Sequence, residues 1–128
     1  MKRVYEISGA DFLSLDGFFE EISRKLNPDV EWGRNLDAFN DILRGGFGPP
    51  ETGFVLRWGD SDFSRERLGY PETARQLRHQ LRTCHRLNRQ KVLEQLKLAE
   101  SQSGDTVFDW LVDIILAHRD DGVELELC

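Results

Sequence analysis

The sequence predicts an α/β protein in which a small three-stranded parallel sheet packs with helices. The chain has 128 residues, of which 39% are hydrophobic and 31% charged, and this predicts a single domain over residues 1–128. Three β-prone segments are separated by helical segments, so the strands should be joined by right-handed crossovers and run parallel. No apolar run approaches the length of about 18 residues that a transmembrane helix needs.

The three strands are expected near the start, the middle and the end of the chain. Residues 3–8 form a β-prone run that stops at Gly9. Residues 53–58 are densely apolar, which predicts a central strand that is covered on both faces. Residues 123–127 alternate apolar and acidic side chains, which is typical of an exposed edge strand.

Six helical segments fill most of the remaining chain, because apolar residues recur in them at steps of three or four. We expect helices over residues 15–26, 35–44, 61–68, 71–84, 88–100 and 106–119. Ser14 and Asn35 are the predicted N-caps of the first two helices. The glycine- and proline-rich stretch 45–53 is predicted to be a loop.

Charge is unevenly distributed along the chain. The net charge is −6 and the isoelectric point about 5.1, which argues against nucleic-acid binding by the molecule as a whole. Residues 65–97 hold nine basic and three acidic side chains, a net +6, whereas the remainder holds eight basic and twenty acidic ones, a net −12. The sequence therefore predicts two surfaces of opposite sign on one small domain.

The sequence lacks the residue patterns of a phosphate-binding loop, a metal site and a nucleophilic catalytic site. The glycine-rich stretch has no lysine of a phosphate-binding loop, and His79, Cys84 and His85 have no second cysteine pair with which to hold a metal. We therefore expect no cofactor and no metal. His118 falls on the apolar side of the last helix and is predicted to be a packed residue. No serine, cysteine or histidine arrangement has the signature of a nucleophilic site, so an enzyme is not expected.

The cysteine content and the N-terminus point to a compartment. Two cysteines, Cys84 and Cys128, are too few for a disulfide framework. The first residues are partly basic, but Glu6 and the lack of an apolar segment exclude a secretory signal. We therefore expect a cytoplasmic protein.

The segment 31–46 carries the most informative pattern. Wound at about 100° per residue, its helix places four polar side chains within about 60° of one line. These are Asp37, Asn40, Asp41 and Arg44, and the far side carries Leu36, Phe39 and Leu43. This is either an amphipathic helix with a solvated face or an anionic surface that docks into a cationic pocket. A third interpretation, a catalytic carboxylate pair, needs a cleft around Asp37 and Asp41.

The core of this segment is the run Trp32-Gly33-x-Asn35-Leu36-Asp37-Ala38-Phe39-x-Asp41-x-Leu43. The run resembles the motif of the barstar family, whose prototype inhibits the secreted bacterial ribonuclease barnase. The segments 54–58 and 122–127 are similar to strands of the family, and the resemblance covers about residues 1–64 and 105–128. It implies the barstar-like fold, a small three-stranded parallel sheet with helices.

The resemblance also implies a mode of binding, in which this helix and the preceding loop plug the active site of a ribonuclease. By position, Asp41 matches the carboxylate that takes the place of a substrate phosphate, and Asp37 matches a second acidic contact. Asn35 matches a polar contact and Trp32 matches one of two paired aromatic residues. The expected partner-binding residues are Trp32, Asn35, Asp37, Asn40, Asp41, Arg44 and Gly45.

The sequence departs from the family pattern on this same face. Glu31 stands in place of an aromatic residue, Asn40 stands in place of a tryptophan, and Arg44 adds a positive charge. The departures leave open which ribonuclease is the target. We expect a non-catalytic bacterial inhibitor or immunity protein of the toxin–antitoxin type. Its partner should be a small, basic, secreted ribonuclease, without membrane, nucleic-acid or small-molecule partners.

A helical hairpin over about residues 65–100 is expected as an insertion before the last helix and strand. Its basic residues include Arg75, Arg78, Arg82, Arg86 and Arg89. The hairpin either extends the core through its leucines or presents a basic face to nucleic acid or an acidic partner. The alternative function is therefore a nucleic-acid-binding or regulatory protein that uses residues 70–97.

Overall fold

The three predicted strands form one parallel sheet. A computed structural model describes residues 2–29, 31–45 and 53–128. The strands are β1 (Arg3–Ser8), β2 (Phe54–Gly59) and β3 (Glu124–Leu127), and their order in the sheet is β1-β2-β3. Both pairs are parallel, with Leu56 of β2 opposite Tyr5 and Leu125. The predicted α/β fold is confirmed, with β2 as the central strand.

Helices alternate with these strands as the sequence pattern predicts. The described residues form six α-helices, which are α1 (Leu15–Leu26), α2 (Leu36–Leu43), α3 (Ser61–Arg67), α4 (Tyr70–Thr83), α5 (Arg89–Glu100) and α6 (Val107–Leu116). The same residues form three short 3₁₀ turns, η1 (Gly9–Asp11), η2 (Arg86–Asn88) and η3 (Arg119–Asp121). The last helix is thus shorter than expected, because the chain turns into η3 after residue 116. No helix in the described ranges combines the length and the apolar character needed to cross a bilayer.

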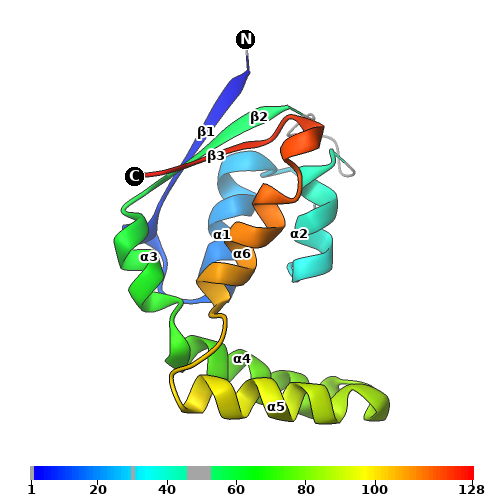
Figure 1. Cartoon of the computed structure of the whole chain (residues 1–128). Coiled ribbons are helices and arrows are strands. Elements are labelled where there is room, and N and C mark those ends of the chain that lie inside the picture. Colours follow the sequence, from blue (N-terminus) through cyan, green and yellow to red (C-terminus); the bar gives the residue numbers. More distant parts are fainter. Residues whose placement is uncertain (1, 30, 46–52) are drawn as a thin grey trace.

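The main core lies between the sheet and a layer formed by α1, α2 and α6 (Figure 1). The ring of Phe18 on α1 packs against Phe39 on α2 and Trp58 on β2, with ring centroids 5.3 and 5.2 Å apart. All three side chains are fully buried. The indole N–H of Trp58 donates a hydrogen bond of 2.9 Å to Ser64 Oγ. Without this bond the buried N–H would have no hydrogen-bond partner. The core therefore fixes α2 against the sheet.

The outer face of the sheet corrects one expectation, because β2 is not covered on both faces. Arg57 lies opposite Glu6 and Glu126 in the sheet register and bonds both carboxylates, at 2.9 and 2.7 Å. The hydrogen bond to Glu126, followed by the one to Glu6, raises the pKa of the Arg57 guanidinium. Helices usually cover both faces of parallel sheets. Here a cross-strand row of paired charges faces the solvent instead.

The hairpin formed by α4 and α5 projects away from the sheet and has a small core of its own (Figure 1). That core is made of Ala74, Leu77, Val92, Leu96 and Ala99. Trp110 on α6 packs against both cores and so links the hairpin to the rest of the molecule. The predicted helices of the hairpin are therefore present, and its buried leucines belong to this second core.

Glu72 anchors the base of the hairpin to α1. Its carboxylate accepts hydrogen bonds from the backbone N–H of Leu15 at 2.8 Å, from Arg75 at 2.6 and 2.8 Å and from Gln76 at 3.1 Å. Burial alone would raise the pKa of this carboxyl, but the bonds from Arg75, Leu15 and Gln76 outweigh burial and lower it. At the same base, Thr73 Oγ1 accepts a bond of 2.8 Å from the N–H of Val107. These bonds fix the position of α4 relative to α1 and α6.

Candidate functional site

Helix α2 is held rigidly, with one face buried and the other exposed. Its predicted N-cap is confirmed, because Asn35 Oδ1 accepts a hydrogen bond of 2.8 Å from the N–H of Ala38. Phe39, Ile42 and Leu43 are at most 1% exposed and face the core. A capped helix with a fully packed apolar side presents its polar side chains in a fixed direction.

The carboxylates of Asp37 and Asp41 are exposed and lie one helical turn apart on this polar side. Neither forms an ion pair within the described part of the chain. Repulsion between two such carboxylates costs a few tenths of a kcal/mol. The helix thus displays an uncompensated anionic pair, which a cationic partner would relieve.

The end of α2 adds two of the other expected binding residues. Arg44 is exposed at the C-cap, and Gly45 follows it with a φ of +82°, a left-handed conformation that suits glycine. The N–H of Gly45 donates a hydrogen bond of 2.9 Å to the carbonyl of Ile42. Residues 46–52 of the predicted loop lie outside the described residues.

Trp32 is largely buried in the structure. Its side chain is 7% exposed and packs edge-on against Phe19, with ring centroids 5.6 Å apart. Its indole N–H has no hydrogen-bond partner in the described residues. Burial against α1 leaves little of the ring exposed, and the expected contact of Trp32 with a partner stays a prediction.

Asn40 connects the polar side of α2 to a buried histidine. His118 is 3% exposed, which confirms its predicted packing, and its Nε2 lies 2.5 Å from Asn40 Oδ1. Its Nδ1 lies 2.8 Å from Asp121 Oδ2 on η3. The sequence showed that His118 lies on an apolar stripe. A polar residue on such a stripe needs partners when buried, and that was the available signal for this contact.

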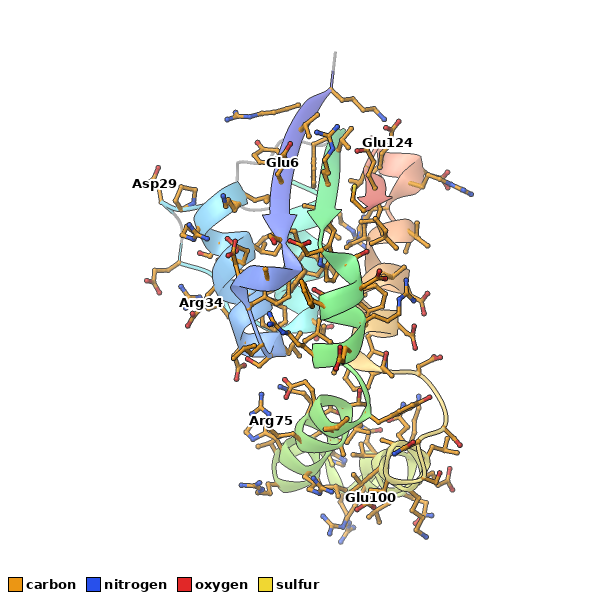
Figure 2. The ribbon with its side chains drawn as sticks, turned by 90° about the vertical axis from the view of Figure 1, so that its left-hand side faces the viewer. Glu6, Asp29, Arg34, Arg75, Glu100 and Glu124 are labelled. Carbon is orange, nitrogen blue, oxygen red and sulfur yellow. The ribbon has the colours of Figure 1, made fainter. Side chains whose placement is uncertain are left out.

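A groove of about 410 Å³ adjoins the N-terminal end of α2. Asp16 and Phe19 on α1 and Asn35 and Asp37 at α2 line one side of it. Gln76, His79 and Gln80 on α4 line the other side. In Figure 2, Arg34 labels the part of the molecule that contains the sheet, and Arg75 labels α4 of the hairpin. Asp37 lines this groove but Asp41 does not, so the two carboxylates do not share the cleft that a catalytic pair would need.

The predicted basic face of the hairpin is largely engaged within the molecule. Arg75 pairs with Glu72 and lies 3.5 Å from Asp16, and its pKa is raised mainly by the hydrogen bond to Glu72. Arg78 pairs with Glu100 at 3.2 Å. Arg89 donates a hydrogen bond of 3.1 Å to the carbonyl of Leu81. The exposed Arg82 and Arg86 form no such bond within the described ranges.

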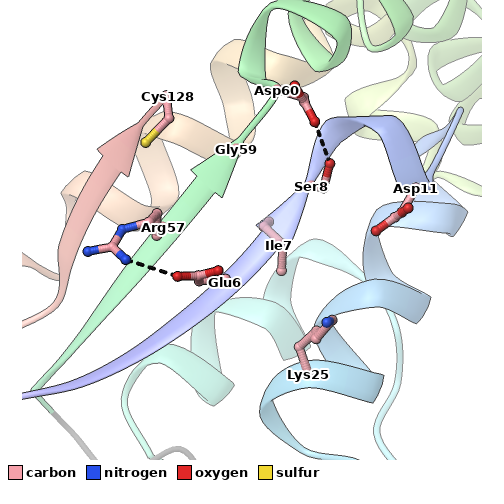
Figure 3. A pocket seen from close by; sticks show the side chains of 9 residues that line it. All are labelled: Glu6, Ile7, Ser8, Asp11, Lys25, Arg57, Gly59, Asp60 and Cys128. Atoms are coloured by element: carbon pink, nitrogen blue, oxygen red, sulfur yellow. Dashed lines mark hydrogen bonds and ion pairs between the residues drawn. The ribbon is translucent and has the colours of Figure 1, made fainter.

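A second cavity, of about 260 Å³, lies at the carboxyl ends of the strands, where α/β folds often bind ligands (Figure 3). Four of its polar side chains bond one another in two pairs. Arg57 pairs with Glu6, and Ser8 Oγ donates a hydrogen bond of 2.8 Å to Asp60. No group of three or more metal-binding side chains occurs in the part of the chain that is described. The self-paired groups make this cavity a weak candidate for a ligand site.

A protein-family model described as Barstar (barnase inhibitor) matches residues 2–99. The matched span runs from β1 through nearly all of α5 and includes the whole of α2. A comparison with curated proteins found no match. Because the match continues through most of the hairpin, the view that this hairpin is an insertion stays a prediction, as does the single domain over residues 1–128.

Proposed function

The chain belongs to the barstar family, and from this we propose that it is a non-catalytic inhibitor of a ribonuclease. The inhibitor would act through the acidic face of α2, which is formed by Asp37 and Asp41. A ribonuclease must hold phosphate groups, so its active site presents cationic side chains. The exposed carboxylates of Asp37 and Asp41 would occupy that site in place of phosphate. Charge attraction would also steer the two proteins together.

The observation that carries this proposal is the absence of intramolecular partners for these two carboxylates within the described residues. The competing proposal is nucleic-acid binding by the hairpin. It is less well supported, because Arg75 and Arg78 already pair with carboxylates of the chain itself. The polar side of α2 is therefore the better candidate for a partner of opposite charge.

The proposed binding residues other than Trp32 lie on α2 or directly beside its ends. Asp41 and Asp37 make the charged contacts, while Asn35, Asn40, Arg44 and Gly45 lie beside them. Trp32 supports the entry to α2 from within. We further place the protein in the bacterial cytoplasm, paired with a small, basic, secreted ribonuclease as in toxin–antitoxin systems.

Inhibition of RNA hydrolysis tests the proposal. The protein would be titrated into barnase and into other small, basic bacterial ribonucleases, and we expect stoichiometric inhibition of at least one. Asp41→Asn should weaken that inhibition without lowering the melting temperature. The matched control is Asp62→Asn, which removes another exposed carboxylate, on α3, and should leave inhibition unchanged. Full inhibition by the Asp41 variant would contradict the acidic-face mechanism.

A further inference from the structure

Three polar side chains from separate segments form a short chain of contacts behind the acidic face. Asn40 belongs to α2, His118 follows α6, and Asp121 ends η3. The imidazole lies between the other two, 2.5 Å from Asn40 Oδ1 and 2.8 Å from Asp121 Oδ2. It is 3% exposed, so water cannot readily replace either contact.

Both atoms that face the imidazole are hydrogen-bond acceptors. A carboxylate oxygen accepts only, and the carbonyl oxygen of an amide accepts as well. Two such contacts require a proton on Nδ1 and a proton on Nε2 of His118. With the Asn40 oxygen toward the ring, the contacts fit an imidazolium cation paired with the Asp121 carboxylate.

A neutral imidazole fits the same place if the amide of Asn40 makes a half-turn. Nδ1 still donates to Asp121, but Nε2 now accepts a hydrogen bond from Asn40 Nδ2. The oxygen and the nitrogen of an amide are nearly equal in size, so the half-turn exchanges them without moving other atoms. Asn40 is half-buried, and its amide atom turned away from His118 changes from N–H donor to carbonyl acceptor.

From this geometry we infer that His118 is a positioning residue that sets, through its protonation, which hydrogen-bonding group Asn40 presents beside Asp41. The imidazolium form turns the amide N–H₂ outward and holds a positive charge behind α2. The neutral form turns the carbonyl outward and removes that charge. His118 thus tunes the polarity of the acidic face without touching a partner.

The consequence for binding rests on the proposed function. A cationic pocket favours an outward carbonyl over an outward N–H₂ group, and it also favours loss of the positive charge. The neutral form should therefore bind a ribonuclease more tightly. Protonation of His118 weakens the complex, so affinity should rise with pH through the range in which the imidazole loses its proton.

Other charged groups lie on the elements packed around this histidine. They are Asp37 and Asp41 on α2, Arg44 at its C-cap, Asp109 and Asp113 on α6, Arg119 and Asp120 on η3, and Glu124 and Glu126 on β3. Carboxylates and guanidinium groups ordinarily keep their charge between about pH 5.5 and 8, where an imidazole titrates. A pH-dependent change over that range therefore points to a histidine.

The free protein tests the inference without any partner. NMR of the ring nitrogens should show His118 protonated on both at low pH and on Nδ1 alone at high pH. An Asn40 N–H should then be hydrogen-bonded to Nε2. Histidine side chains in water favour a proton on Nε2, so the Nδ1–H form is a distinctive result. A neutral ring protonated on Nε2, or a ring that never changes form between about pH 5 and 9, would overturn the inference.

The complex tests the effect on binding. We expect the affinity of the wild-type protein for its ribonuclease to rise about fivefold or more from pH 5.5 to pH 8, relative to His118→Phe. The matched control is His79→Phe/His85→Phe, which removes the other two histidines of the chain and should keep the wild-type profile. Equal pH profiles for wild type and His118→Phe would overturn the effect.

A second variant guards against a folding defect in His118→Phe. Asn40→Asp places a carboxylate opposite Nε2, which should hold the ring in its doubly protonated form across the same pH range. Its NMR titration should then be flat. A normal titration in this variant would show that Asn40 does not face the ring. If no ribonuclease binds at all, the proposed function fails, whereas the ring-nitrogen result for the free protein still stands or falls by itself.

Discussion

The acidic face of α2 and the α4–α5 hairpin both expose charged side chains, but they differ in whether those charges form ion pairs within the chain. Asp37 and Asp41 have no ion-pair partner in the described residues. In the hairpin, Arg75 and Arg78 pair with carboxylates of the same chain. Exposure alone therefore does not distinguish a binding surface from a solvated one. The presence or absence of an internal partner is the more useful criterion.

The two regions also differ in what holds them in place. Helix α2 packs on the main core through Phe39 and neighbouring side chains. The hairpin has its own small core and is joined to the body through Trp110 and the bonds of Glu72. A change in the hairpin core should therefore alter stability without altering the polar side of α2. Four experiments test this division, from the largest expected effect to the smallest.

The largest effect should come from neutralising both carboxylates of α2. We expect Asp37→Asn/Asp41→Asn to weaken ribonuclease binding by about 4 kcal/mol, near a thousandfold, because in the proposed complex these carboxylates would face a desolvated cationic site. The matched variant is Arg82→Gln/Arg86→Gln in the hairpin, which should cost less than about 1 kcal/mol. Calorimetric binding constants measure both. A greater loss of binding free energy in the arginine variant would indicate that the interface lies on the hairpin.

A cavity in the hairpin core should have the next largest effect. Leu77 is 1% exposed, and we expect Leu77→Ala to lower the free energy of unfolding by about 3 kcal/mol. Leu98, 49% exposed on the same hairpin, is the control, and Leu98→Ala should cost less than about 0.5 kcal/mol. Urea denaturation measures both changes. Ribonuclease binding at low temperature should stay the same, and its loss would show that the two regions are coupled.

The anchor of the hairpin should make stability depend on pH. The pKa of Glu72 is lowered below its ordinary value of 4.5, so its stabilisation is present above about pH 4.5. That stabilisation is lost as pH falls through the lower pKa of the folded state. We expect Glu72→Gln to cost about 2 kcal/mol at neutral pH and to flatten the acid limb of the stability profile.

Melting temperatures between about pH 3 and 7 measure that profile. The reference variant is Glu66→Gln, which removes one exposed carboxylate on α3 outside the anchor. An acid limb equally steep in the Glu72 variant and in the wild type would show that the anchor does not supply the pH dependence.

The smallest effect should come from the ion pair on the outside of the hairpin. Arg78 and Glu100 are about half exposed, at 52% and 50%. Water and salt screen such a pair, so Arg78→Gln should change the free energy of unfolding by less than about 0.5 kcal/mol. The same measurement in high salt should shrink the difference further. A loss above about 1 kcal/mol would mean that this pair, like Glu72, secures the hairpin.

Local patterns in the sequence predicted the elements well. Asn35 and Ser14 both cap their helices through the expected side-chain hydrogen bonds. The apolar stripe of α6 is buried as expected, and so is His118, which follows this helix. These features depend on neighbours within about one helical turn, so spacing alone is enough to find them.

Features that depend on distant residues were not predictable in the same way. Arg57 interrupts an otherwise apolar strand, and only its pairing with Glu6 and Glu126 explains why that face stays open to solvent. Trp32 lies outside any periodic segment, so its burial against Phe19 left no pattern in the sequence. The partner of His118 on α2 is 78 residues away.

The charged row on the outer face of the sheet has a consequence for crowded solutions. A sheet with one uncovered face can associate with a second copy of the protein, either by face-to-face stacking or by pairing along its edge strands. Glu6 on one edge strand and Glu126 on the other flank Arg57, and Glu124 pairs with Lys2 at 3.0 Å. A second copy would have to remove water from these charged groups, which discourages aggregation through this surface. Replacing those glutamates with threonine would remove their charges and should promote aggregation through this face.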